Sequence, residues 1–192
     1  MNTPAHLIFG AAAFARPNAP GVTAAALFGA LLPDLSLYLM VGWHMFWLDT
    51  PPQVIFDELY FSEAWMRVFR VDNSFVLWGL ALATALWVRS DWAIALTGAA
   101  FLHLACDFPL HHDDGRPQFW PITNWVFESP ISYWDGRAYG DIVGPIEAAV
   151  SLALCLVLWF RFRSIPARAV ISLAALSQLV PGLIWIFVFA SG

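Results

Sequence analysis

The sequence contains no lysine and few charged residues of any kind. Only 12% of its 192 residues are charged and 60% are hydrophobic, whereas an ordinary soluble domain has about 25% charged and about 45–50% apolar residues. All nine basic residues are arginines, and the 14 acidic residues outnumber them. No basic patch is therefore available to bind a nucleic-acid backbone. This composition excludes an ordinary soluble protein, a disordered chain and a nucleic-acid binder.

Cysteine is also scarce. Cys106 and Cys155 lie singly in apolar stretches, so they form no CxxC motif and no disulfide framework. Aromatic residues, in contrast, are abundant, with 11 Trp and 16 Phe. Aromatic rings concentrate where a membrane meets water. The sequence predicts an integral membrane protein whose natural partner is membrane lipid.

Long apolar runs predict the membrane-spanning helices. A spanning helix needs about 20 mostly apolar residues. Four segments qualify by this criterion: 21–41, 91–108, 142–160 and 169–190. Segment 74–88 is shorter but carries no charge, and we expect it to form a fifth span. Segment 4–15 is apolar but too short to cross alone, so we expect a half-helix packed against the bundle. The predicted fold is an all-α polytopic membrane bundle of five to six spans, formed by residues 1–192 as one domain.

Segment 52–70 has a different pattern. Polar residues recur among its aromatic residues at a helical period, which is typical of an amphipathic helix lying in the membrane interface. Thr50, Pro51 and Pro52 form a suitable helix start. We therefore expect one interfacial helix over 52–70.

Segment 107–141 is the one long non-apolar stretch, and it is rich in Pro and Trp. Loops of this length in compact proteins are usually functional or disordered, and the many aromatic residues argue against disorder. Large aromatic side chains bury substantial area at low entropic cost. We therefore expect Trp120, Trp125 and Trp134 to fold this segment as a cap over one mouth of the bundle.

The arginines predict the orientation. Cytoplasmic loops carry an excess of Lys and Arg, and the short loop 161–168 contains Arg161, Arg163 and Arg168. This loop is placed in the cytoplasm and segment 107–141 outside. The expected location is a bacterial inner (plasma) membrane, with the cap on the outer face.

Several ionisable residues interrupt the apolar segments. Such residues are costly in hydrocarbon and usually mark function. At about 1.5 Å rise per residue, Asp34, His103 and Asp107 fall in the outer half of the membrane, and His6 joins them if the chain starts outside. His103 and Asp107 are four residues apart, so their side chains share one helix face.

This set is suited to a divalent metal. His103 and Asp107 offer a nitrogen and a hard oxygen ligand, and His6 with Asp34 would complete a four-ligand site. Zinc is the expected metal because mixed histidine and carboxylate ligation suits it, while two carboxylates also admit manganese or iron. A metal site with an open position acidifies a bound water and so produces a nucleophile for hydrolysis.

Other polar residues near this layer are further candidates. His111 and His112 in the cap are candidates for the catalytic acid or base, and Asn73, Ser74 and Glu147 are additional site candidates. The histidines and Glu147 have structural alternatives as well. The two histidines fit a solvated turn, and Glu147 fits a hydrogen bond to a neighbouring helix. Asp34 follows a proline, so its carboxylate alternatively satisfies backbone groups freed at a helix kink.

The order of these motifs resembles a known family. The stretches HLIFGAAAF, GALLPDLS, HLACDF and FWPITNW are together similar to the membrane-bound, metal-dependent hydrolases whose prototype is an inner-membrane protein regulated by the SOS repressor. The resemblance covers the chain to about residue 127. It implies that the metal ligands are His6, Asp34, His103 and Asp107, and it matches the family's aromatic-Pro-Ile/Leu segment to Trp120-Pro121-Ile122.

Two positions depart from that family's pattern. Ser36 stands where the second carboxylate of Pro-Asp-x-Asp is usual, and Asn73 stands where a His precedes Ser74. The expected function is metal-dependent hydrolysis of an ester or phosphoester, with membrane lipid as substrate, at the outer leaflet. The alternative is a non-catalytic, degenerate membrane scaffold. A transporter is disfavoured because no polar track continues towards the cytoplasm.

Overall fold

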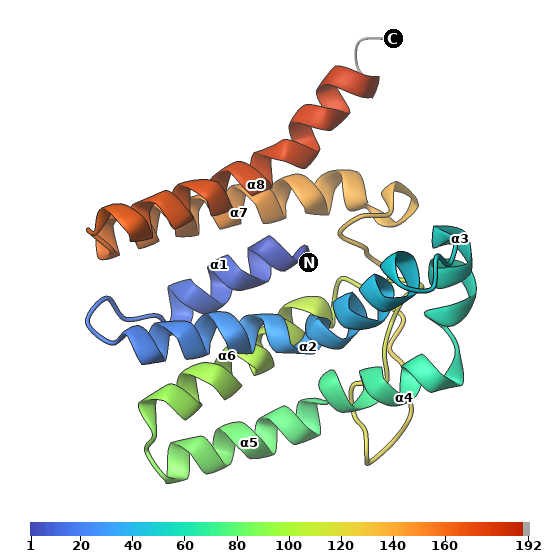
Figure 1. The fold of residues 1–192 in the computed structure, drawn as a ribbon, viewed down its shortest axis with the longest axis horizontal. Coiled ribbons are helices and arrows are strands. Elements are labelled where there is room, and N and C mark those ends of the chain that lie inside the picture. The colour runs from blue at the N-terminus through green and yellow to red at the C-terminus, as the bar shows by residue number, and fades with distance from the viewer. Residues whose placement is uncertain (190–192) are drawn as a thin grey trace.

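The computed structural model describes the backbone of residues 1–189 and the side chains of residues 1–179. Every regular element in this part of the chain is helical (Figure 1). In chain order the elements are α1 (Thr3–Phe14), α2 (Pro20–Phe46), α3 (Pro52–Val54), the π-helix η1 (Ile55–Leu59), α4 (Glu63–Asp72), α5 (Phe75–Trp87), α6 (Asp91–Asp107), the 3-10 helix η2 (Gly136–Ala138), α7 (Gly140–Arg161) and α8 (Ile165–Phe189). The predicted all-α class is confirmed for the described residues.

The short helix α1 occupies the middle of the arrangement. Figure 1 shows α1 between the pair α7 and α8 on one side and α2 with α6 on the other, and α1 contacts all four. Helix α5 packs on the outer side of α6. On the α7 side, Ile8 and Ala11 of α1 pack against Cys155 and Leu158. The expected half-helix is thus enclosed by the longer helices.

Small residues bring α1, α2 and α6 into close contact. A Cβ atom placed on Gly29 of α2 would lie 2.0 Å from the carbonyl oxygen of Leu96 in α6, and one placed on Gly10 of α1 would lie 2.7 Å from the Cβ of Ala30. Glycine and alanine at helix contacts allow backbones to approach in this way. The three helices that carry the predicted site residues are therefore held backbone against backbone.

Two helices of the described chain, α2 and α7, are long and apolar enough to cross a membrane. The prediction of five to six spans is not confirmed. Helix α1 is apolar but short, and α5 and α6 have only 13 and 17 residues, below the length of about 20 that a straight span needs. The ends of these two helices lie within one residue of the predicted segments 74–88 and 91–108, with Ser74 and Ser90 at the N-cap positions.

The single interfacial helix predicted over 52–70 is wrong in its extent. The chain forms α3 and η1, turns, and starts a new helix, α4, at Glu63. The break occurs because Ser62 caps α4 by accepting a hydrogen bond from the backbone N–H of Trp65. Helix α4 is amphipathic, as expected for this region: Trp65 and Phe69 are buried, while the side chains of Glu63 and Arg67 are exposed.

Segment 107–141 is ordered, but two of its three tryptophans lie at the surface. Trp125 and Trp134 are each 54% exposed, so the prediction that they fold the cap is wrong for these two residues, whereas Trp120 is half-buried and its carbonyl accepts a hydrogen bond from the Ser74 hydroxyl. Buried serines hold the loop by hydrogen bonds to backbone carbonyls and amides. The Ser129 hydroxyl donates to Pro109 O at 2.5 Å, and the Ser132 amide donates to Ala138 O at 2.8 Å. The loop is therefore shaped by polar contacts that lie under its aromatic surface.

Candidate metal centre

Two histidines from different helices approach the carboxylate of Asp107. The Nε2 atom of His6, on α1, lies 2.9 Å from Oδ1, and the Nε2 atom of His103, on α6, lies 3.1 Å from Oδ2. All three side chains are buried, and the ligand atoms that they offer lie within 4.8 Å of one another. This buried cluster, called the His-His-Asp cluster below, can hold a metal ion.

The tautomer of His103 is fixed by the neighbouring helix. Its Nδ1 lies 2.7 Å from the carbonyl oxygen of Ala30. A carbonyl oxygen only accepts, so Nδ1 is assigned the proton and Nε2 keeps its lone pair towards the cluster. The Nε2 atoms of His6 and His103 have no well-aligned hydrogen-bond partner although Asp107 is close. Metal-binding histidines almost always donate the other ring N–H in this way.

Local sequence explains how the two rings meet. His103 and Asp107 are one helical turn apart, so both side chains leave α6 on the same face. The imidazole of His6 stacks on that of His103, with ring centroids 3.5 Å apart and planes inclined by 9°. Gly10, one turn beyond His6, lies against Ala30 of α2 and Ala99 of α6, so α1 comes close to both helices and His6 can stack on His103. The cluster therefore depends on the tight contact of α1, α2 and α6.

Asp34 lies beside the cluster. Its Oδ1 is 3.7 Å from His103 Nε2 and 3.6 Å from a guanidinium nitrogen of Arg116, and its Oδ2 accepts a hydrogen bond from the Thr3 hydroxyl at 3.0 Å. These partners are side chains of other segments, which is not the arrangement expected of a residue satisfying its own helix at a kink. The structure thus brings together all four predicted ligands, with Asp34 at a longer distance than the other three.

The first two residues of the chain, Met1 and Asn2, have different partners near the cluster. The Met1 ammonium hydrogen-bonds Asp107. Glu147 of α7 accepts hydrogen bonds from the backbone and side-chain amides of Asn2, whose side chain also pairs with Gln178 of α8. Glu147 does not contact the His-His-Asp cluster. It fixes the start of α1, as its structural alternative predicted.

The two cap histidines point to different partners. His111 Nε2 lies 3.5 Å from Asp107 Oδ2, and its Nδ1 lies 2.9 Å from Asp114 Oδ1. His112 Nδ1 instead lies 2.6 Å from the carbonyl oxygen of Ser129. His111 therefore borders the cluster, and His112 holds the cap loop. The prediction of a catalytic role for His112 has no support in these contacts.

The environment of His111 favours its charged form. Burial by itself would lower the pKa of His111, but the contacts with Asp107 and Asp114 outweigh it and raise the pKa. Burial likewise would raise the pKa of Asp114, and its contact with His111 lowers it overall. Asp114 thus orients His111 and stabilises a proton on it beside the cluster.

Asn73 and Ser74 do not reach the cluster. The Asn73 amide donates to the carbonyl oxygens of Phe69 and Pro33 at 3.1 and 3.3 Å, and its Oδ1 accepts from Arg116 at 2.9 Å. Ser74 caps α5 by accepting from the Leu77 N–H at 3.0 Å. Both residues position neighbouring groups, which makes them supporting residues and not ligands.

Arg116 is the residue that the sequence interpretation missed. Its side chain is only 7% exposed, and its guanidinium carbon lies 4.7 Å from the ring centroid of Phe69. Burial by itself would lower the pKa of Arg116, but Tyr60 and Asp34 raise it overall, so the group is a permanent charge. The signal for Arg116 in the sequence was its position two residues after the HHDD stretch, between Gly115 and Pro117.

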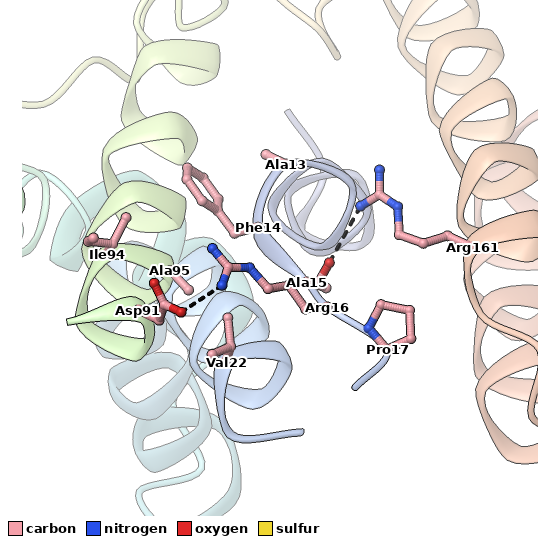
Figure 2. Close-up of a pocket in the computed structure, with 10 residues that line it drawn as sticks. All are labelled: Ala13, Phe14, Ala15, Arg16, Pro17, Val22, Asp91, Ile94, Ala95 and Arg161. Atoms are coloured by element: carbon pink, nitrogen blue, oxygen red, sulfur yellow. Dashed lines mark hydrogen bonds and ion pairs between the residues drawn. The ribbon is translucent and has the colours of Figure 1, made fainter. Parts of the chain in front are cut away.

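Two cavities lie away from the cluster. One, of about 350 Å³, is at the far end of α1 and α6, where Arg16 pairs with Asp91 at 2.6 Å and Arg161 donates to the Ala15 carbonyl at 3.5 Å (Figure 2). The other, of about 430 Å³, lies between α4 and the cap, and its lining includes Gly115 and Pro117. The second cavity therefore adjoins the loop that carries Arg116.

No protein-family model, curated protein or solved structure matches this chain. The resemblance to the SOS-regulated type of membrane hydrolase consequently stays a prediction. The described fold and site define an all-helical protein with two helices able to span a membrane and a buried cluster able to hold a metal ion. Function is therefore argued from the cluster and its neighbours.

Proposed function

We propose that this protein is a membrane-embedded hydrolase that uses a divalent metal to cleave an ester or phosphoester. The observation that carries the proposal is the hydrogen bond from His103 Nδ1 to the Ala30 carbonyl, which leaves the Nε2 lone pair on the side of Asp107, the carboxylate that His6 Nε2 also approaches. Outer hydrogen bonds of this kind orient metal ligands and fix their tautomers. If His6 and His103 were buried only for packing, there would be no reason for both of their Nε2 atoms to face the Asp107 carboxylate without a well-aligned hydrogen bond.

The donor set fits a catalytic metal. Two atoms that each lie about 2.0–2.2 Å from one tetrahedral zinc ion are about 3.3–3.6 Å from each other, and the contacts of 2.9 and 3.1 Å from Asp107 to His6 and His103 are slightly shorter than this spacing. Three protein ligands with room for a further group are typical of catalytic zinc, whereas structural zinc sites have four. With Asp34 as an added carboxylate, manganese or iron is also accommodated.

His111 is proposed as the catalytic acid or base. A divalent ion bound by the cluster supplies Lewis acidity and an acidified water at neutral pH. Asp114 holds His111 through Nδ1, and this leaves Nε2 facing Asp107 at 3.5 Å. A ring held by a carboxylate on one nitrogen presents the other for proton transfer. His111 therefore takes or delivers a proton at Nε2.

A lipid-like substrate is consistent with the surroundings of the site. The end of α2 exposes Trp43, Phe46 and Trp47, and the cap exposes Trp125 and Trp134. Aromatic residues of this kind gather at the level of lipid headgroups. We propose that the cluster lies near this level, facing outward from a bacterial inner membrane, with the arginine-rich loop 161–168 in the cytoplasm. An amphiphilic ester would then reach the cap from the lipid side.

A non-catalytic scaffold is the second candidate, and one observation favours it. The Met1 ammonium contacts Asp107, so the buried carboxylate can be neutralised without a metal. An unpaired buried carboxylate would be costly, but here the cost is already reduced. Metal binding therefore separates the two candidate functions.

Metal analysis of the protein purified in detergent tests the proposal. We expect about one zinc ion per chain in the wild type after loading and dialysis, and none in His103→Ala or Asp107→Asn. His44→Ala is the matched control, because His44 contacts Thr50 at 3.3 Å and lies outside the cluster. A folded wild-type protein that binds no zinc, manganese or iron would favour the scaffold. Metal-dependent hydrolysis of reporter esters and phosphoesters by the loaded protein would then establish the reaction class.

A further inference from the structure

We infer that the substrate is a phosphoester and that Arg116 binds its anionic oxygens; this inference rests on the proposed metal-dependent hydrolysis. The guanidinium of Arg116 is held in place mainly by neutral groups. Its Nη1 donates to Asn73 Oδ1 at 2.9 Å, its Nε donates to the Tyr60 hydroxyl at 3.3 Å, and its plane covers the ring of Phe69. The position of the guanidinium is thus fixed, while no close ion pair neutralises its charge.

The nearest carboxylate pairs with Arg116 only loosely. Asp34 Oδ1 lies 3.6 Å from Arg116 Nη1, whereas a charge-assisted N–H···O bond measures about 2.7–2.9 Å. The same oxygen lies 3.7 Å from His103 Nε2, so Arg116 is separated from the His-His-Asp cluster by a single carboxylate. Within the described residues, Nη2 of Arg116 has no hydrogen-bond partner. One arm of the guanidinium is therefore free to bind another group.

The charges at the cluster also require an anion once a metal is bound. Asp34 and Asp107 supply two negative charges at the cluster and its immediate edge, and Arg116 supplies one positive charge. A divalent ion adds two positive charges, and uncompensated charge is expensive in a buried site. A neutral carboxylic ester leaves that excess in place. A phosphoester brings one or two negative charges with it.

The guanidinium group itself favours phosphate. Its planar fork matches two oxygens of a phosphate group, and phosphoryl transfer places charge on the non-bridging oxygens that a metal and an arginine stabilise together. The tetrahedral intermediate of carboxylic ester hydrolysis has one anionic oxygen, so it does not use both arms of the guanidinium fork while the metal also binds it. Asn73 then has a defined part in the site, since it positions Arg116. A lipid phosphate and a soluble phosphoester share this chemistry.

Inorganic phosphate is the probe that tests the inference without an assay of turnover. Calorimetric titration of phosphate into the zinc-loaded protein in detergent should show binding for the wild type. Arg116→Gln should lose it, and Arg116→Lys should weaken it by about tenfold or more, because lysine keeps the charge but not the fork. Arg137→Gln is the matched control. Arg137 lies in the same loop with an 83% exposed side chain, and among the described residues it forms an ion pair with Asp135 alone.

The outcomes separate this inference from the proposed function. Equal phosphate affinity in the wild type and in Arg116→Lys, with one metal per chain in both, would overturn the role of Arg116 and leave the hydrolase proposal standing. Absence of metal from the wild type would remove the hydrolase proposal first. Thermal unfolding and metal content show whether Arg116→Gln folds. If it does not, phosphate binding is compared in Arg116→Lys and Asn73→Ser instead. Asn73→Ser should weaken phosphate binding because it removes the amide that holds the guanidinium.

A competition arm identifies the source of the phosphate group. The loaded protein is placed in nanodiscs of phosphatidylcholine with or without phosphatidate, and bound phosphate is measured in each. Displacement of phosphate by phosphatidate supports a lipid monoester, and displacement already in phosphatidylcholine alone supports a lipid diester. Full phosphate binding in both membranes supports a soluble phosphoester. Loss of the Arg116 dependence in every membrane would contradict the inference.

Discussion

His103 donates its Nδ1 proton to the carbonyl oxygen of Ala30, 2.7 Å away across the contact between α6 and α2. This bond ties a cluster residue on one helix to the backbone of another. The carbonyl is available because α2 and α6 approach closely at Gly29. The orientation of the imidazole therefore depends on how the two helices pack, and packing changes should alter metal binding.

Gly29→Ala should destabilise the protein and reduce its metal content. The new Cβ would lie 2.0 Å from the Leu96 carbonyl oxygen, which forces α2 and α6 apart, and overpacking of this kind costs about 1–3 kcal/mol. Thermal unfolding in detergent and metal analysis are the measurements. Gly42→Ala is the control on the same helix, since its Cβ would meet nothing within 4 Å, and it should change stability by less than about 1 kcal/mol. Equal behaviour of the two variants would contradict the close packing.

The two carboxylates of the site should differ in importance. Asp107 contacts both histidines at 2.9 and 3.1 Å, whereas Asp34 is 3.7 Å from His103. We expect Asp107→Asn to abolish metal binding and Asp34→Asn to weaken the affinity while leaving a measurable site. Because a ligand that binds only the folded state stabilises it by about 2.7 kcal/mol at 100 times its Kd, zinc should raise the Tm of the wild type and of Asp34→Asn but not that of Asp107→Asn. The reverse order would move the metal towards Asp34.

His111→Gln and His112→Gln should have separate effects. Removal of the acid or base should lower the hydrolysis rate by about 10²–10⁴-fold in His111→Gln, with the metal content unchanged. His112→Gln should keep more of the rate but loosen the cap, because it breaks the contact of 2.6 Å to Ser129. Limited digestion with a glutamate-specific protease detects this change as faster cleavage after Glu128, the exposed residue next to Ser129. Equal loss of rate in both variants would remove the distinction between them.

The orientation of the chain is tested by cysteine labelling in intact cells. After replacement of Cys106 and Cys155, single cysteines are introduced at Ser164 and at Gly136, where an added Cβ meets nothing within 4 Å. An impermeant maleimide should label position 136 and not position 164, because the arginine-rich loop is expected in the cytoplasm. Labelling of position 164 alone would reverse the proposed orientation, and the cluster would then face the cytoplasm.

The sequence predicted the cluster better than it predicted the helices around it. His103 and Asp107 follow from helical phase alone, and His6 and Asp34 follow from estimated depth along apolar segments. The ends of α5 and α6 were predicted where the apolar runs stop, but the start of α4 was not, because Ser62 begins it through a single hydrogen bond that hydropathy does not register. Of the segments predicted to span, α2 and α7 are long and apolar enough to cross a membrane within the described residues.

The cap could not be predicted from its aromatic content. Arg116 lies in a loop with no periodic pattern, and its burial depends on Phe69 and Asn73, more than 40 residues away in the chain. His111 and His112 are adjacent in sequence, and only the position of the Ser129 carbonyl decides which of them turns towards the cluster. Contacts that link distant segments through backbone carbonyls leave no local signal.

The hydrogen bonds from Asn2 to Glu147 and Gln178 have a consequence for folding during synthesis. They join the start of α1 to α7 and α8, which follow 145 and 176 residues further along the chain. A chain synthesised as far as α6 already contains His6, His103 and Asp107, and α1 can pack on α2 and α6, but the partners of Asn2 are still missing. The cluster therefore reaches its final geometry only after α7 and α8 have docked, and metal retention should report that docking.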